Sequence, residues 1–261
     1  MKKGFTLIEM SIVLMIIAAI IAGVMLGKSL ITTSRLQTVI TNVNTYTSAV
    51  SNFKQAYQGL PGDFTNATTL WGTDSNGCTN GGGSTCNGDG DGKIFTSQGT
   101  GKVSETALFW QHLALAGMFS QSTSDKASSG GAFDSTIGAN VANGSFRGSG
   151  FSVYWWGTVA AGDSVRFSGY YGNIIMFGTS HSIVSGTVDY NITRDPIITA
   201  DQAAAIDSKM DDGVPATGMV RAYVSSTTIA PNCTTTAVAS TSKYNVSANG
   251  NLCSLIFVMG F

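Results

Sequence analysis

Apolar residues are distributed unevenly along this chain of 261 residues. Residues 5–26, which read FTLIEMSIVLMIIAAIIAGVML, are apolar on every side of a helix apart from Glu9 and two hydroxyl residues. A helix of this length spans about 33 Å, enough to cross the hydrocarbon core of a bilayer. The pattern therefore predicts a membrane-spanning helix over residues 5–26, and Lys2 and Lys3 keep its N-terminus on the cytoplasmic side.

Beyond this segment the apolar residues recur at alternating spacings of three and four, the spacing of one helix face. They are Leu36, Val39, Val43, Tyr46, Val50, Phe53 and Tyr57. Gly59, predicted as the C-terminal cap, and Pro61 then end the pattern. We expect one continuous helix over residues 5–58, first transmembrane and then amphipathic, which packs against the rest of the chain. A coiled-coil homodimer is the alternative for its second half.

From residue 59 onward, short runs of apolar and β-branched residues alternate with clusters of Gly, Asn and Ser. Four runs predict strands of an antiparallel sheet: 151–159, 173–178, 219–225 and 252–260. Two segments predict short helices: 104–119 with Ser104 as N-cap, and 199–210 with Thr199 or Asp201 as N-cap. The predicted fold class is therefore α+β, with residues 59–261 as one globular, disulfide-bonded head on the long helix.

The composition fits an exported head. Only 11% of residues are charged and the net charge is −1, so the chain has no broad basic face for nucleic acid. The even number of cysteines in an exported, loop-rich region predicts two disulfides. Three pairings are open, and we favour Cys78–Cys86 and Cys233–Cys253 because each closes a local loop. The alternative, a metal site, lacks CxxC spacing and a nearby His.

The segment KGFTLIEMSIVLMIIAAI closely resembles the N-terminal segment of type IV pilins and pseudopilins. LPGDF, FWQHLALAG and IDSKMDDGVPATG look like segments of pilin-like proteins with large heads. The resemblance implies that prepilin peptidase removes the leader, residues 1–4, by cutting between Gly4 and Phe5, and that Phe5 becomes the methylated terminus. A secretory signal peptide, the alternative, predicts a shorter apolar run and a change of pattern after its cleavage site.

Glu9 is the charged residue within the apolar segment, where a carboxylate costs about 2.5–3.5 kcal/mol near the centre of a membrane helix. Cleavage creates a positively charged amine on Phe5. The resemblance implies that Glu9 pairs with such an amine, within or between subunits, during filament assembly. The alternative is that Glu9 reaches the membrane interface and has no further role.

The resemblance implies a structural and not an enzymatic role. The chain is expected in the inner membrane as a precursor and then in an extracellular or periplasmic type IV pilus-like filament whose core is built from residues 5–26. Its expected partners are prepilin peptidase and identical or related pilin subunits. A pseudopilin of a type II secretion system is the alternative within this class, and a signal-anchored secreted adhesin or enzyme is the alternative from another class.

The stretch CNGDGDGKIF, residues 86–95, is similar to the first half of an EF-hand loop, in which oxygen ligands alternate. The candidate metal ligands are Asn87, Asp89 and Asp91. Gln98 stands where a bidentate Glu belongs, so Asp74 or Glu105 would have to complete the site. Calcium is thus the cofactor that the sequence suggests, and a solvated Gly-Asp turn is the alternative.

Other candidate groups are predicted to be structural. Paired carboxylates can serve acid–base chemistry. Three aspartates lie close together here, Asp207, Asp211 and Asp212, but the adjacent pair closes a predicted helix, which explains it without catalysis. His112 is expected in the core and His181 in a loop or at a strand edge. A GxSxG motif is absent, so nucleophilic catalysis has no support. Four aromatic residues suggest a sugar- or surface-binding patch, unless alternation buries one of each pair: Trp155, Trp156, Tyr170 and Tyr171.

Overall fold

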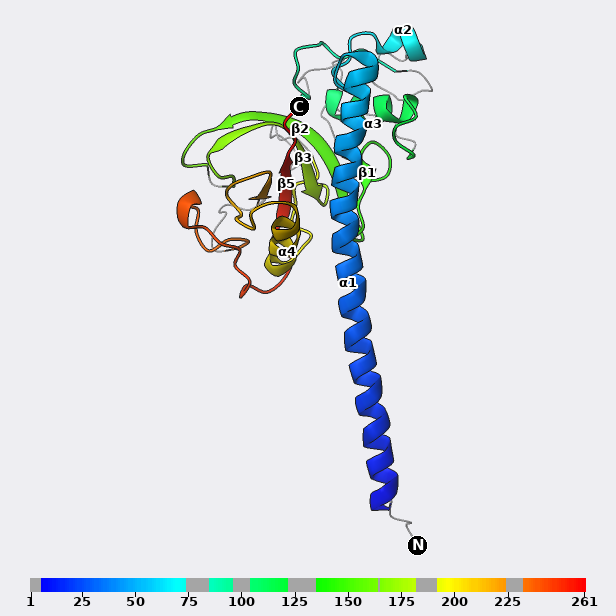
Figure 1. Ribbon diagram of the computed structural model, residues 1–261, viewed down its shortest axis with the longest axis vertical. Coiled ribbons are helices and arrows are strands. Elements are labelled where there is room, and N and C mark those ends of the chain that lie inside the picture. Colours follow the sequence, from blue (N-terminus) through cyan, green and yellow to red (C-terminus); the bar gives the residue numbers. More distant parts are fainter. Residues whose placement is uncertain are drawn as a thin grey trace.

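The computed structural model describes residues 6–73, 85–95, 104–121, 135–163, 165–181, 192–223 and 232–261. The helices are α1 (Leu7–Tyr57), α2 (Ala67–Trp71), α3 (Glu105–Leu115), α4 (Ala200–Met210) and the 3₁₀ turn η1 (Ala239–Thr241). The strands are β1 (Ala142–Asn143), β2 (Gly150–Val159), β3 (Gly169–Gly178), β4 (Val220–Tyr223) and β5 (Ser254–Val258). As Figure 1 shows, α1 projects far beyond a head built from the other elements. The α+β prediction is confirmed.

The second half of α1 packs on the head along the predicted face. The apolar positions of this face are buried from Leu36 to Phe53, and Tyr57 is partly buried against the same core. The predicted cap is wrong, because the left-handed residue is Gln58, with φ 56°, and not Gly59. A Cβ on Gly59 would lie 2.9 Å from the ring of Phe64, so close packing explains that glycine.

The sheet has the order β1-β2-β3-β5-β4 and all of its pairs are antiparallel. The four predicted strands are present, whereas β1, with two residues, is too short to give an alternating pattern. β2 and β3 form a long hairpin with a bulge where Gly157 pairs with Gly172. Both glycines have positive φ, 56° and 61°, which glycine adopts most readily. The C-terminal strand β5 then inserts between β3 and β4 (Figure 1).

One hydrophobic core joins α1, α3, α4 and the sheet. Tyr46 of α1 connects them: its ring lies 4.8 Å from that of Trp110 in α3 and 5.3 Å from that of Phe151 in β2, both edge-to-face. Such aromatic pairs stabilise a core beyond the area they bury. The amphipathic half of the long helix is therefore part of the core of its own head.

The structure supports part of the predicted disulfide framework. Cys233 and Cys253 form a disulfide with a sequence separation of 20, which confirms that pairing. Cys86 is disulfide-bonded as well, but its predicted partner Cys78 lies outside the described residues. Thr199, the first of the two predicted caps, is the N-cap of α4, and its N–H donates to Gln202 Oε1 at 3.2 Å.

Candidate functional site

The first half of α1 is an apolar helix surface without cover from its own chain. Leu14, Met15 and Leu26 are 66%, 73% and 69% exposed, and α1 has no buried residue before Leu36. In the part of the chain that the structure describes, α1 is the helix long and apolar enough to cross a membrane. An apolar surface of this extent requires a bilayer or a protein partner.

A capping box builds the start of α1. Thr6 is the N-cap, and both its N–H and its hydroxyl donate to Glu9 Oε2 at 2.8 Å, while the Glu9 N–H donates to Thr6 Oγ1 at 3.3 Å. A Thr followed three residues later by Glu favours this arrangement. Glu9 Oε1 has no partner among the described residues, which include neither Gly4 nor Phe5. Among those residues from 6 to 261 that the structure describes, the carboxylate thus has one oxygen available for a further donor.

At the opposite end of the molecule, Asp63 organises the predicted metal loop. Its Oδ1 accepts the N–H groups of Gly90 at 2.5 Å and Asp91 at 3.1 Å, and its Oδ2 accepts that of Gly92 at 2.8 Å. Gly90 and Gly92 have φ 80° and 82°, so successive N–H groups converge on one carboxylate. Asp63 is only 5% exposed, and burial raises its pKa. The loop is therefore folded around a side chain from outside it.

Glu105 of α3 is a second buried carboxylate beneath the same loop. Its oxygens accept the N–H groups of Asp89 at 3.1 Å and Phe95 at 3.0 Å. Burial raises the pKa of Glu105 to about 7, and the nearby negative charges act in the same direction. Of the two residues predicted to complete a metal site, Glu105 thus contacts the loop through backbone groups, and Asp74 lies outside the described residues.

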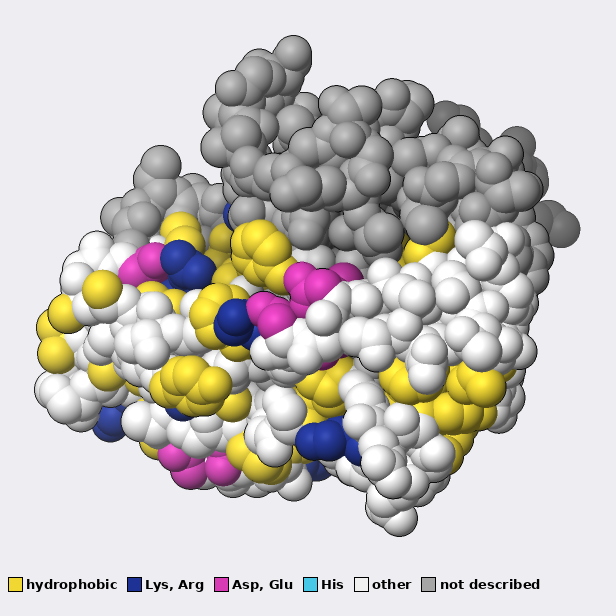
Figure 2. Space-filling view, turned by 90° about the horizontal axis from the view of Figure 1, so that it is seen from above, with side chains coloured by type: hydrophobic (Ala, Val, Ile, Leu, Met, Phe, Trp, Pro, Cys, Tyr) yellow, Lys and Arg dark blue, Asp and Glu magenta, His cyan; other side chains and the backbone are white. Residues whose placement is uncertain are grey.

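Carboxylate oxygens of Asp63, Asp89 and Asp91 lie within 4.8 Å of one another. Seen from above, one group of acidic side chains lies near the centre of the head surface, apart from others nearer its edge (Figure 2). Asn87 points elsewhere, since its Oδ1 accepts the N–H of Thr68 in α2 at 2.9 Å. The sequence pattern thus located the loop but missed Asp63, which belongs to the LPGDF segment. Calcium binding itself stays a prediction.

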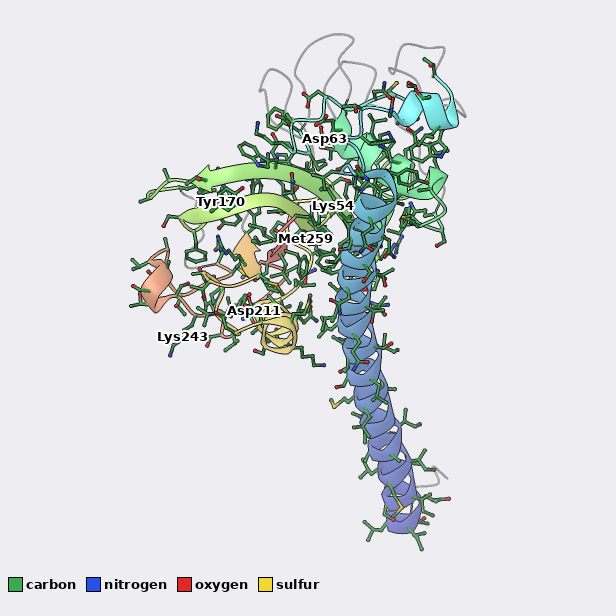
Figure 3. The ribbon with its side chains drawn as sticks, turned by 45° about the horizontal axis from the view of Figure 1, so that its top comes forward. Lys54, Asp63, Tyr170, Asp211, Lys243 and Met259 are labelled. Atoms are coloured by element: carbon green, nitrogen blue, oxygen red, sulfur yellow. A yellow bond between two sulfur atoms is a disulfide. The ribbon has the colours of Figure 1, made fainter. Side chains whose placement is uncertain are left out.

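A second acidic cluster closes the turn between α4 and β4, near the Asp211 label in Figure 3. Asp207 is buried and accepts the hydroxyl of Tyr244 at 2.8 Å and the N–H of Gly213 at 3.1 Å. Burial raises the pKa of Asp207 to about 6. Asp212 accepts the N–H of Val214 in the turn that follows, and Asp211 accepts that of Val220 at the start of β4. These contacts give the three carboxylates the structural role that the sequence predicts.

The two histidines also have structural partners. His112 Nδ1 accepts the N–H of Gly62 at 2.9 Å, so its Nε2 carries the proton and donates to the carbonyl of Cys86 at 3.0 Å. Burial lowers the pKa of His112 to about 4, which keeps the ring neutral. His181 lies just after β3, with its Nδ1 2.7 Å from Asp195 Oδ1. His112 is therefore a core residue, as predicted.

The predicted aromatic patch is divided. Tyr170 is 66% exposed and Tyr171 is buried, as strand alternation predicts. Both tryptophans are half-buried, and a cation lies over each ring. Lys93 Nζ lies 5.3 Å from the ring centre of Trp155, and the Arg166 guanidinium lies 4.8 Å from that of Trp156. The four rings therefore form no continuous open platform.

A projecting N-terminal helix, apolar in its first half, on an α+β head with an antiparallel sheet is the architecture of pilin-like proteins. Residues 1–25 match the family model described as the prokaryotic N-terminal methylation motif, the prepilin-type cleavage and methylation segment of type IV pilins. No curated protein and no solved structure matches the chain significantly. The motif supports a membrane-anchored, type IV pilin-like or pseudopilin substrate of prepilin peptidase, and it is typical of structural proteins.

Proposed function

We propose that this protein is a structural subunit of a type IV pilus-like filament. Prepilin peptidase cleaves it after Gly4, and the first half of α1 then packs against the same segment of other subunits. One observation carries the proposal: the apolar half of α1 is exposed, and the methylation motif covers most of it. Burying apolar surface contributes about 25 cal/mol per Å², so side-by-side packing of such helices is strongly favourable outside a bilayer.

Glu9 supplies the specificity of this packing. Its Oε2 is held by Thr6, so its orientation is set within the subunit, and Oε1 remains for the amine of Phe5 from a neighbouring subunit. A carboxylate surrounded by apolar side chains gains most from a positively charged donor. The pairing favours the axial register in which amine and carboxylate meet.

Mass spectrometry of the protein recovered from cells tests the processing step. The expected mature chain begins at Phe5 and carries one additional methyl group on its amine. A chain that still begins at Met1 contradicts processing and supports the signal-anchored monomer instead.

Two substitutions at Glu9 test assembly. Glu9→Gln keeps an oxygen for the Thr6 hydrogen bonds and removes the charge, whereas Glu9→Ala removes both. We expect both variants to be exported and cleaved, and both to lose at least about 90% of the filaments counted by electron microscopy of sheared cell-surface material, since one charged hydrogen bond in an apolar setting decides assembly. Normal filament yield from Glu9→Gln contradicts the charge pairing, and normal yield from both contradicts any role of Glu9.

A further inference from the structure

Three basic residues lie on α1 or on the turn beside it, where α1 leaves its apolar half. Lys28 and Arg35 are seven residues apart, so they lie on the same helix face two turns apart. Arg147 belongs to the turn between β1 and β2. This turn lies beside α1 (Figure 1), with Ser145 Oγ donating to the Arg35 carbonyl at 2.9 Å and the Arg35 guanidinium 5.9 Å from the ring centre of Phe146. We call Lys28, Arg35 and Arg147 the basic collar.

The basic collar is exposed and carries uncompensated charge. All three side chains are exposed, and none forms an ion pair with an acidic group in the described ranges. Within α1 itself, Glu9 is the sole acidic residue, so no carboxylate on the helix balances them. Neighbouring cations that form no ion pair within the described ranges favour an anionic partner.

The height of the collar on α1 identifies this partner. Lys28 follows closely after Leu26, the end of the membrane-length segment, and exposed Leu30 and Ile31 extend the apolar surface past it. Each headgroup layer is about 5–8 Å thick. Lys28 thus lies at headgroup level, and Arg35, about 14 Å beyond Leu26 along the helix, reaches the edge of this layer with its long side chain. The turn that carries Arg147 lies beside Arg35, because Ser145 and Phe146 of this turn contact it.

We propose that the basic collar binds anionic phospholipid headgroups on the exported side of the membrane and seats the head on the bilayer before assembly. The proposal rests on the membrane-anchored precursor of the proposed function, but it requires neither cleavage nor Glu9. A single cation near an anionic surface gains about fivefold in affinity, and salt weakens this attraction.

Lipid selectivity of the full-length chain tests the proposal, with one copy in each nanodisc so that no second subunit is present. The probes are spin-labelled phosphatidylglycerol and spin-labelled phosphatidylcholine, and the measurement is their relative association with the protein. We expect at least a twofold preference for phosphatidylglycerol, which falls close to one in high salt. In the triple variant Lys28→Gln, Arg35→Gln, Arg147→Gln the preference should fall by about half, and the remainder comes from Lys2 and Lys3 at the other membrane face. Unchanged near-ultraviolet circular dichroism of the head confirms that the variant is folded.

Lys54→Gln is the matched control for Lys28→Gln. Lys54 is also an exposed lysine of α1, and it undergoes the same change. It lies about 39 Å farther from the membrane along the helix, beside the head (Figure 3). We expect Lys54→Gln to leave the lipid preference unchanged. An equal loss in Lys54→Gln, or full preference in the triple variant, overturns the proposal. The proposal is also overturned if the triple variant keeps the lipid preference of the parent chain but self-associates more weakly when several copies share a membrane. The basic collar would then contact a second subunit.

Glu9→Gln separates this proposal from the proposed filament function. We expect the variant to keep the full preference for phosphatidylglycerol while it fails to form filaments. A loss of lipid preference in Glu9→Gln would show that the preference comes from the start of α1, which also contradicts a role of the basic collar.

Discussion

The two halves of α1 share one continuous backbone and have opposite surroundings. From Leu36 to Phe53, one face is buried in the head, whereas from Leu7 to Ile31 no residue is buried. Both halves carry apolar side chains. The comparison shows that the second half completes a core within its own chain, while the first half leaves its apolar surface for a bilayer or another subunit.

The polar residues explain this difference. In the second half, Thr and Ser hydroxyls on the outer face bond back to carbonyls one turn earlier, as Thr38 does to Ser34 at 3.0 Å and Ser48 to Asn44 at 2.9 Å. The outer face of the second half is therefore polar and can remain in contact with water. The first half has no such face, because apolar residues surround the helix. Stability of the head should therefore depend on the second half alone.

Phe53→Ala should have the largest effect and tests this division most directly. Phe53 is fully buried, and its ring contacts those of Phe64 and Trp71. Removal of a buried phenylalanine side chain leaves a cavity and costs about 3–5 kcal/mol. We expect this decrease in the free energy of unfolding of the full-length chain in detergent micelles, measured by urea titration with tryptophan fluorescence.

Leu14→Ala in the exposed half is the matched control for Phe53→Ala. We expect its free energy of unfolding to stay within about 0.5 kcal/mol of the parent value, as for substitutions away from a core, and its filament yield to fall. If Leu14→Ala destabilises the head as much as Phe53→Ala, the two halves are not independent.

The Cys233–Cys253 disulfide tests whether the stability of the head can be lowered without an effect on filament assembly. Replacing both residues by Ala should lower the free energy of unfolding by about 3 kcal/mol, because the bridge closes a loop of about 20 residues in the unfolded chain. The same urea titration measures it. Filament yield per folded subunit should not change, because the bridge lies away from the first half of α1. An unchanged unfolding midpoint would contradict this stabilising role.

Asp207→Asn tests an internal polar contact of the head. Burial raises the pKa of Asp207 to about 6, above the value of an unfolded chain. Between about pH 4 and 6 the folded chain holds more protons, so the free energy of unfolding falls as the pH rises, by an order of 1–3 kcal/mol from this group. We expect Asp207→Asn to flatten the pH profile of urea unfolding over this range, whereas Asp201→Asn on the exposed start of α4 should not. Parallel profiles for Asp207→Asn and the parent would contradict the assignment.

Calcium should have the smallest effect on the free energy of unfolding. Its predicted site is the cluster of Asp63, Asp89 and Asp91. For a millimolar site, 10 mM calcium should raise the free energy of unfolding by about 1 kcal/mol. Asp89→Asn combined with Asp91→Asn should abolish the gain, and magnesium serves as the ionic-strength control. No heat of binding by calorimetry at millimolar calcium would reject the calcium prediction and leave the Gly-Asp turn.

Local patterns predicted most of the fold. The apolar spacing of the second half of α1 marks one buried helix face, and the short β-branched and aromatic runs mark strands β2 to β5, of which β2 and β3 are buried on both faces. Short elements escaped prediction, because the two residues of β1 and the five of α2 are too few for a period. The left-handed cap at Gln58 escaped as well, since the packing of Phe64 on Gly59 fixes that turn.

The amino-acid sequence alone determined the membrane-length helix, its methylation motif, the amphipathic face of its second half and the α+β class, because each depends on neighbours along the chain. Only the tertiary structure decided that Asp63 and Glu105 hold the loop of residues 86–95, that β5 lies between β3 and β4, and that the turn of Arg147 lies beside Arg35. These groups are far apart in sequence, and folding of the whole chain brings them together.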